Sequence, residues 1–151
     1  MKLSSKGRYA LRALFDLAYY AEEAALQLRD IAARQAIPHR FLEQIFRDLR
    51  CAALVVAKRG PKGGYRLARA PENISVGDVV RALEGPLLLT PPEGEGQGGD
   101  ALSQMVTASV LGEVAGAMQD CMDRVTLADL CARARTRGLR RAPPERYTYV
   151  I

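Results

Sequence analysis

The sequence predicts a mainly α-helical fold with one small β-hairpin, because three patterns follow one another along the chain. Apolar residues recur at helical spacing before residue 54 and again after residue 75. Between them, residues 54–59 and 65–68 are β-prone runs separated by a turn-rich segment, Gly60-Pro61-Lys62-Gly63-Gly64. The length of 151 residues, with 48% apolar and 26% charged residues, is typical of one globular core with a further element attached.

Three helices are expected before the hairpin. The first covers about residues 6–21, behind Ser4 and Ser5, either of which could cap it. The second covers residues 28–35 and stops before Pro38, which holds Ile37 extended and suits the first turn of a new helix. The third runs from about His39 to Ala53. Its apolar stripe leaves a polar face outside, made of His39, Arg40, Glu43, Gln44, Arg47 and Arg50.

Two helices joined by a tight turn, the second with Arg and Gln on its free face, are typical of a helix-turn-helix with a recognition helix. The hairpin that follows suits a wing, because glycines at its tip allow close approach to a sugar-phosphate backbone. Arg59, Lys62 and Arg66 place cations on or near that tip. The predicted fold class is therefore mainly α with a small β-hairpin, a winged helix-turn-helix.

Beyond the hairpin, Ser75 and Asp78 form a capping-box variant that opens a helix through Leu83. Residues 85–99 contain three Pro and five Gly and predict a flexible loop. The apolar stripe over residues 100–124 is too long for so small a domain to cover. We therefore expect a dimerisation helix, with a core helix of a single chain as the alternative. Another capping box, Thr126 to Asp129, opens a short helix to about Arg135.

The predicted organisation is a DNA-binding domain over residues 1–85, a flexible loop over 86–99, the dimerisation helix and the short helix over 100–135, and a tail over 136–151. Residues 1–70 carry 14 basic and 6 acidic side chains, whereas residues 71–151 carry 8 and 11. This asymmetry is expected if one end meets a polyanion and the other meets protein, although a solvated basic face would look the same. The chain lacks a signal peptide and a long apolar run, so we expect a cytoplasmic protein.

Several segments in the same order resemble the Rrf2 family of bacterial winged-helix regulators. They are residues 1–10, 31–32, 41–46, 49–50, 59–65 and 74–80. The resemblance is close over residues 1–86 and looser through the long helix. It implies a homodimer that binds partly palindromic, double-stranded promoter DNA, with the third helix in the major groove and the wing in the minor groove.

The resemblance also implies roles for individual residues. The base-facing positions are Pro38, His39, Arg40, Phe41 and Glu43, with Gln44 nearby, and the minor-groove residue is Arg59. Arg40 could donate to guanine, Gln44 could pair with adenine, and Glu43 could accept from a cytosine amino group. A start-of-helix or phosphate role is expected for His39, the single histidine. The expected phosphate contacts, which fix register without reading sequence, are Ser4, Ser5, Lys6, Arg8, Tyr9 and Lys62.

The cysteines depart from the iron–sulfur members of the family, which place three cysteines in the loop before the long helix. Here residues 86–104 contain neither Cys nor His, so we expect no cluster, no metal site and no cofactor. Cys51, Cys121 and Cys131 have no metal-ligand spacing and are expected to be reduced, semi-buried packing residues. The alternative is a redox- or iron-responsive regulator that uses these thiols, with Cys51 beside Arg50 as a candidate sensor.

The cysteine-free loop and the apolar end of the chain are similar to the cluster-free cysteine-metabolism repressors of the family. This likeness implies a repressor of cysteine or sulfur genes whose tail engages O-acetylserine thiol-lyase, a cysteine synthase. Tyr149, Val150 and Ile151 would enter its active site; alternatively, the tail packs on its own dimer. A winged-helix module that binds only protein is a further alternative. No catalytic motif is present, so an enzyme is not expected.

Overall fold

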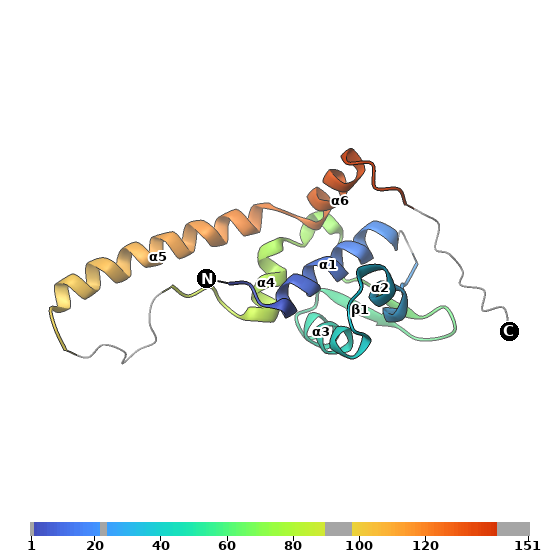
Figure 1. Ribbon diagram of the computed structural model, residues 1–151, viewed down its shortest axis with the longest axis horizontal. Helices are drawn as coiled ribbons and strands as arrows, with labels where there is room; N and C mark the ends of the chain where they lie inside the picture. Colours follow the sequence, from blue (N-terminus) through green and yellow to red (C-terminus); the bar gives the residue numbers. More distant parts are fainter. Residues whose placement is uncertain (1, 22–23, 90–97, 142–151) are drawn as a thin grey trace.

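The computed structural model describes residues 2–21, 24–89 and 98–141 (Figure 1). A compact group of helices carries a short hairpin, and one long helix projects away from it. The elements are α1 (Ser5–Tyr20), α2 (Leu28–Gln35), α3 (His39–Cys51), β1 (Val55–Lys58), β2 (Gly64–Leu67), the 3-10 helix η1 (Pro71–Asn73), α4 (Val76–Glu84), α5 (Ala101–Arg124) and α6 (Leu127–Thr136). The predicted mainly α fold with a small hairpin is confirmed.

The helices begin at residues whose side chains satisfy free backbone N–H groups. The Ser4 hydroxyl accepts a hydrogen bond from Gly7 N at 3.1 Å, so Ser4 rather than Ser5 caps α1. Capping boxes open α4 at Ser75 and α6 at Thr126, as the sequence predicted. Local sequence signals therefore determine where these helices start.

The turn between α2 and α3 is three residues long and contains Ala36 in the left-handed region, with φ of 50°. Its N–H bonds to carbonyls at the end of α2, which closes that helix. Ile37 follows and is buried, with 4% of its surface exposed. A second left-handed alanine, Ala53 with φ of 55°, lies between α3 and β1. A residue in the left-handed region thus lies in each of the two turns that flank α3.

The hairpin is held to the helices at its base. β1 and β2 pair antiparallel with Val55 opposite Leu67, and Tyr65 also exchanges two backbone hydrogen bonds with Leu26, at 2.9 and 2.7 Å. Gly64 has φ of +146°, and a Cβ there would lie 2.2 Å from the Leu26 carbonyl oxygen. Only glycine therefore allows this close approach of the two backbones.

The core is formed mainly by α1, α2 and α3. Its large, fully buried side chains include Leu14, Leu17, Ile31 and Phe46. Leu127 of α6 belongs to the same cluster, and α6 packs against α1. The chain therefore returns to the core of the winged domain after α5. No helix in the described residues is long and apolar enough to cross a bilayer.

Candidate DNA-binding surface

The outer face of α3 is polar and exposed, as the sequence predicted. The helix buries Leu42, Ile45, Phe46 and Leu49 at a spacing of three and four residues. The opposite face exposes His39, Arg40, Glu43, Gln44, Arg47 and Arg50. Arg40, Arg47 and Arg50 form no ion pair with any residue that the structure describes. Their guanidinium groups are therefore free to bind an external partner.

The first turn of α3 carries exposed polar residues and also contacts α1. Pro38 is the N-cap residue and His39 Nδ1 lies 3.5 Å from Glu43 Oε1, one helical turn away. Phe41 is half-buried, because its ring packs edge-on against the Tyr9 ring with centroids 5.7 Å apart. Of the residues expected to face bases, Phe41 thus also holds the start of α3 against α1.

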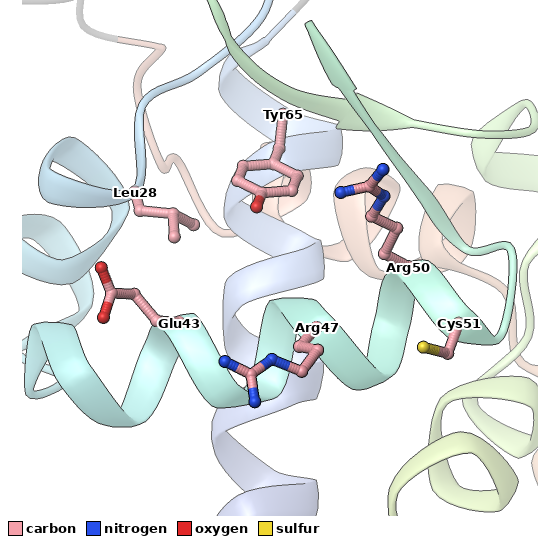
Figure 2. Close-up of a pocket in the computed structure, with 6 residues that line it drawn as sticks. All are labelled: Leu28, Glu43, Arg47, Arg50, Cys51 and Tyr65. Carbon is pink, nitrogen blue, oxygen red and sulfur yellow. The ribbon is translucent and has the colours of Figure 1, made fainter.

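A hollow with a volume of about 620 Å³ lies between α3, the start of α2 and the hairpin. Figure 2 shows the residues that line it: Leu28, Glu43, Arg47, Arg50, Cys51 and Tyr65. The Arg50 side chain points toward the hairpin, while the Arg47 side chain points away from it. Two unpaired guanidinium groups can donate hydrogen bonds to a phosphate, and Leu28 and Tyr65 offer apolar surface to the sugar next to it.

Sequence reasoning left Arg47 and Arg50 out of the expected DNA contacts, although it placed both on the outer face of α3. The signal that could have included them is their spacing, since they follow Glu43 by four and seven residues and therefore lie on the same side of the helix. Leu28 and Tyr65 gave no such signal, because only the folded chain brings α2 and β2 to this hollow.

The residues expected to bind phosphates before and within α1 have different surroundings. The Ser4 hydroxyl donates to Glu84, and Lys6 forms an ion pair with Asp48 of α3. Arg8 is exposed and donates to the Leu3 carbonyl oxygen at 2.7 Å and to the Ser5 hydroxyl at 3.1 Å. Ser4 and Lys6 therefore already have partners within the chain, and Lys6 in particular ties α1 to α3.

The wing tip carries the two remaining expected contacts. Arg59 and Lys62 are exposed and have no ion-pair partner in the described part of the chain. The turn between them closes through a hydrogen bond from Gly63 N to the Gly60 carbonyl oxygen at 2.9 Å. Because Tyr65 packs on Phe46 of α3 with ring centroids 4.8 Å apart, the hairpin is anchored beside α3.

The last turn of α2 is tied to α1 by polar contacts that face the turn before α3. Arg34 pairs with Asp16, and Gln35 donates to Asp16 Oδ2 at 3.0 Å. Arg12 in turn donates to the Gln35 side chain at 3.3 Å. These contacts fix the angle between α1 and α2, and hence where α3 begins.

A second surface, separate from the α3 face, lies on the projecting helix α5. Large apolar side chains are exposed along it, with Leu102 at 62% and Met105 at 63% exposure, together with Val106, Val110, Leu111 and Val114. Ala115 is the one buried residue of this helix. Apolar surface gathered on one element in this way marks a protein interface.

A helix-turn-helix with a free cationic face, followed by a hairpin wing, defines a winged helix-turn-helix regulator. Residues 3–133 match the family described as "Rrf2: Iron-dependent Transcriptional regulator", and the chain belongs to this family. The prediction of a transcriptional regulator rather than an enzyme is thereby confirmed.

Individual relatives are similar over most of the chain. The HTH-type transcriptional regulator IscR of Aliivibrio salmonicida is 41% identical over 130 residues, which cover 86% of this chain and 77% of the relative. Among solved structures, T. potens IscR is 37% identical with a TM-score of 0.74 and covers 94% of each chain. The structure of CymR, the global cysteine regulator of B. subtilis, is 34% identical with a TM-score of 0.71, covering 88% of this chain and 98% of that one.

The family description raises the question of whether the residues present fit iron. Within the described ranges, no group of three or more His, Cys, Asp and Glu side chains could hold a metal ion. The cysteines lie on three separate helices, and burial raises the pKa of the Cys131 thiol, which disfavours the thiolate that metals bind. The expectation of semi-buried thiols was wrong for Cys51 and Cys121, which are exposed; Cys131 is buried. The described residues do not fit an iron centre.

Proposed function

We propose that this chain is a homodimeric regulator that binds partly palindromic promoter DNA in a sequence-specific way. The observation that carries the proposal is the free cationic face of α3 beside a wing that exposes Arg59 and Lys62. The 14 basic and 6 acidic residues among residues 1–70 give this end a net charge of +8, which suits a polyanion.

In this proposal α3 lies in the major groove and reads bases through Arg40, Glu43 and Gln44 near its N-terminus. Pro38, His39 and Phe41 lie against the same bases, and Arg59 enters the minor groove. The phosphates are bound by Ser4, Ser5, Lys6, Arg8, Tyr9 and Lys62, to which the hollow adds Arg47 and Arg50.

The homodimer forms through the apolar face of α5. A single chain leaves Val106 at 55% and Val110 at 53% exposure, and a second copy of the same helix supplies a matching apolar face. Two recognition helices related by a two-fold axis would read half-sites about 34 Å apart, one turn of B-DNA. The partly palindromic operator follows from that symmetry.

The test is selection of bound sequences from a random double-stranded DNA library, followed by affinity measurements over a range of salt concentrations. We expect a two-fold symmetric consensus and a loss of affinity of about 10³- to 10⁵-fold between 50 and 200 mM salt, if 6–10 phosphates are contacted. Salt-independent binding, or no enriched sequence, would contradict the proposal and favour a module that binds only protein.

For the regulated genes, the proposal is repression of cysteine or sulfur metabolism in the cytoplasm. Residues 86–104 lack Cys and His, and the chain is similar to a global cysteine regulator. Tyr149, Val150 and Ile151 lie outside the described residues, and we propose them as the contact with cysteine synthase. Binding of O-acetylserine thiol-lyase to the full chain, and its loss on deletion of Val150 and Ile151, is the expected result. Equal binding by both forms would exclude this contact.

An iron-dependent regulator is the second candidate, because the family description and the IscR relatives favour it. Protein purified without oxygen would then contain iron and show a visible charge-transfer absorption. The cysteine proposal expects neither, and it also expects DNA affinity to be unchanged by a chelator.

A further inference from the structure

α5 meets the winged domain at an ion pair between Arg81 of α4 and Asp123, one residue before the end of α5. Arg81 Nη2 lies 2.8 Å from Asp123 Oδ1 and 3.2 Å from Asp78 Oδ1. Asp78 is held by the capping box of α4, in which its Oδ2 accepts from Ser75 N at 2.9 Å. Arg81 therefore connects the fixed first turn of α4 to the last turn of α5.

The two helices approach each other closely at this point. A Cβ on Gly77 would lie 1.8 Å from Asp123 Oδ1, so no side chain fits there while Asp123 keeps its place. The Ser75 hydroxyl also lies at 3.5 Å from the same carboxylate oxygen. The position of the Asp123 carboxylate is thus limited from three sides.

Just beyond the ion pair, two backbone hydrogen bonds join the chain after α5 to the chain before α4. Val76 N donates to the Val125 carbonyl oxygen at 2.8 Å, and Leu127 N donates to the Ile74 carbonyl oxygen at 2.9 Å. These two hydrogen bonds form an antiparallel bridge between Ser75 and Thr126, which holds the C-terminal end of α5 to the winged domain. The Arg81–Asp123 ion pair is a second contact, between side chains, at the same junction.

We propose that the Arg81–Asp123 ion pair is a specificity-determining contact that sets the distance between the two DNA half-sites. This rests on the proposed function, in which α5 forms the dimer and α3 reads the DNA. Val110 lies 13 residues before Asp123, or about 20 Å along the helix. A rotation of about 10° at the junction moves such a point by about 3.5 Å, close to the 3.4 Å rise of one base pair.

The free donor on Arg81 supports a role in setting geometry. Its Nη1 is buried and has no hydrogen-bond partner among the described residues. Burying a donor without a partner is unfavourable, so packing alone does not account for an arginine at this place. The polar contacts of the Arg81 guanidinium in the described residues are therefore those of Nη2 with Asp78 and Asp123, which span α4 and α5.

The experiment measures the affinity of the full-length dimer for operators whose selected half-sites are separated by the preferred distance and by one or two base pairs more or fewer. Wild-type protein should prefer one spacing by tenfold or more. Arg81→Gln and Asp123→Asn should reduce this preference to threefold or less, and Arg81→Lys, which keeps the charge, should restore part of it. Asp120→Asn is the matched control, since it makes the same change one turn away on an exposed residue without a described ion-pair partner.

Loss of affinity by the same factor at every spacing, or an unchanged preference, would overturn the proposal. Sedimentation and circular dichroism establish that each variant is dimeric and folded. Should Arg81→Gln not fold, Asp123→Asn decides the question, because the Asp123 side chain is 38% exposed. Failure of wild-type protein to dimerise or to bind DNA would instead refute the proposed function.

Discussion

Asp16 and Arg34 form a bidentate ion pair that joins α1 to α2 inside the domain. The Asp16 side chain is fully buried and lies 2.7 Å from Arg34 Nη2, while Arg34 Nε donates to both carboxylate oxygens. The guanidinium group also stacks on the Tyr20 ring, with its carbon 4.8 Å from the ring centroid. Hydrogen bonding to Asp16 raises the pKa of Arg34, so the guanidinium group stays charged.

Removing this carboxylate should destabilise the protein strongly. Asp16→Ala leaves a partly buried guanidinium without its partner, and we expect a loss of about 3 kcal/mol in the free energy of unfolding, measured by urea denaturation. The control is Arg29→Ala, which removes the outer partner of an exposed pair at 3.9 Å from Asp30. That control should cost less than about 1 kcal/mol. Equal losses in the free energy of unfolding would show that the buried pair contributes no more to stability than the exposed pair.

Replacing the left-handed alanines by glycine should stabilise the protein. Ala36 and Ala53 have φ of 50° and 55°, where a Cβ costs about 1–2 kcal/mol and glycine costs nothing. After the larger entropy of unfolded glycine is subtracted, each variant should gain about 0.5–1 kcal/mol. Ala33→Gly, inside α2, should instead lose about 1 kcal/mol. Thermal unfolding of the three variants tests whether the backbone angle decides the sign.

Arg40→Ala and Lys62→Ala should affect DNA binding in different ways. Because Arg40 is expected to face bases, Arg40→Ala should reduce the free energy of DNA binding by about 1–3 kcal/mol and relax the base preference at one position of the site. Lys62→Ala, at the wing tip, should weaken binding to all DNA sequences alike and lower the salt dependence of the affinity by about one counterion. Binding to a set of singly substituted operators separates the two. Uniform losses from both variants would refute the assignment of Arg40.

A charge on the apolar face of α5 should separate the dimer without unfolding the chain. The Val110 side chain is 53% exposed in the single chain, so Val110→Glu removes little packing within it. In the dimer the carboxylate would be buried without a partner, and we expect monomers in sedimentation experiments. Ala132→Glu, at an exposed position of α6, is the control and should remain dimeric. A dimeric Val110→Glu variant would place the interface elsewhere.

The capping box of α4 should contribute to stability in a pH-dependent way. Burial acts to raise the pKa of Asp78, but hydrogen bonds from Ser75 and Arg81 outweigh it and hold the pKa below its ordinary value. A lowered pKa in the folded state means that the stabilisation is complete above the unfolded value near 3.9 and is lost as pH falls below it. Asp78→Asn should therefore flatten the stability profile below about pH 4. If the free energy of unfolding of Asp78→Asn falls below pH 4 as steeply as that of the wild-type protein, other carboxylates cause the loss of stability in acid.

The sequence predicted the helices well because their starts are local. Ser75 and Thr126 are each followed by an acidic residue three positions later, and both capping boxes are present. The boundaries of α2 were predicted without error, since Pro38 marks the break in the chain. The polar face of α3 could be predicted from its helical spacing, whereas the individual DNA contacts were expected from the resemblance to the Rrf2 family.

The long-range contacts could not be predicted. Nothing near Asp16 or Asp123 in the sequence indicates that each meets an arginine from another helix, 18 and 42 residues away. The left-handed turns at Ala36 and Ala53 escaped notice because alanine carries no turn signal, unlike glycine. The exposure of Cys51 and Cys121 depends on how helices pack, which composition does not determine.

Leu127 in the core holds the C-terminal end of α5 to the winged domain, whereas the N-terminal end of the helix projects away from it (Figure 1). The outer part of the helix, before Ala115, makes no buried contact with that domain in the described residues. Helical turns can therefore be gained or lost there without disturbing the folding of the domain. If the proposed dimer forms through α5, the distance between its two copies of α3 can change in the course of evolution while the residues of α3 stay the same.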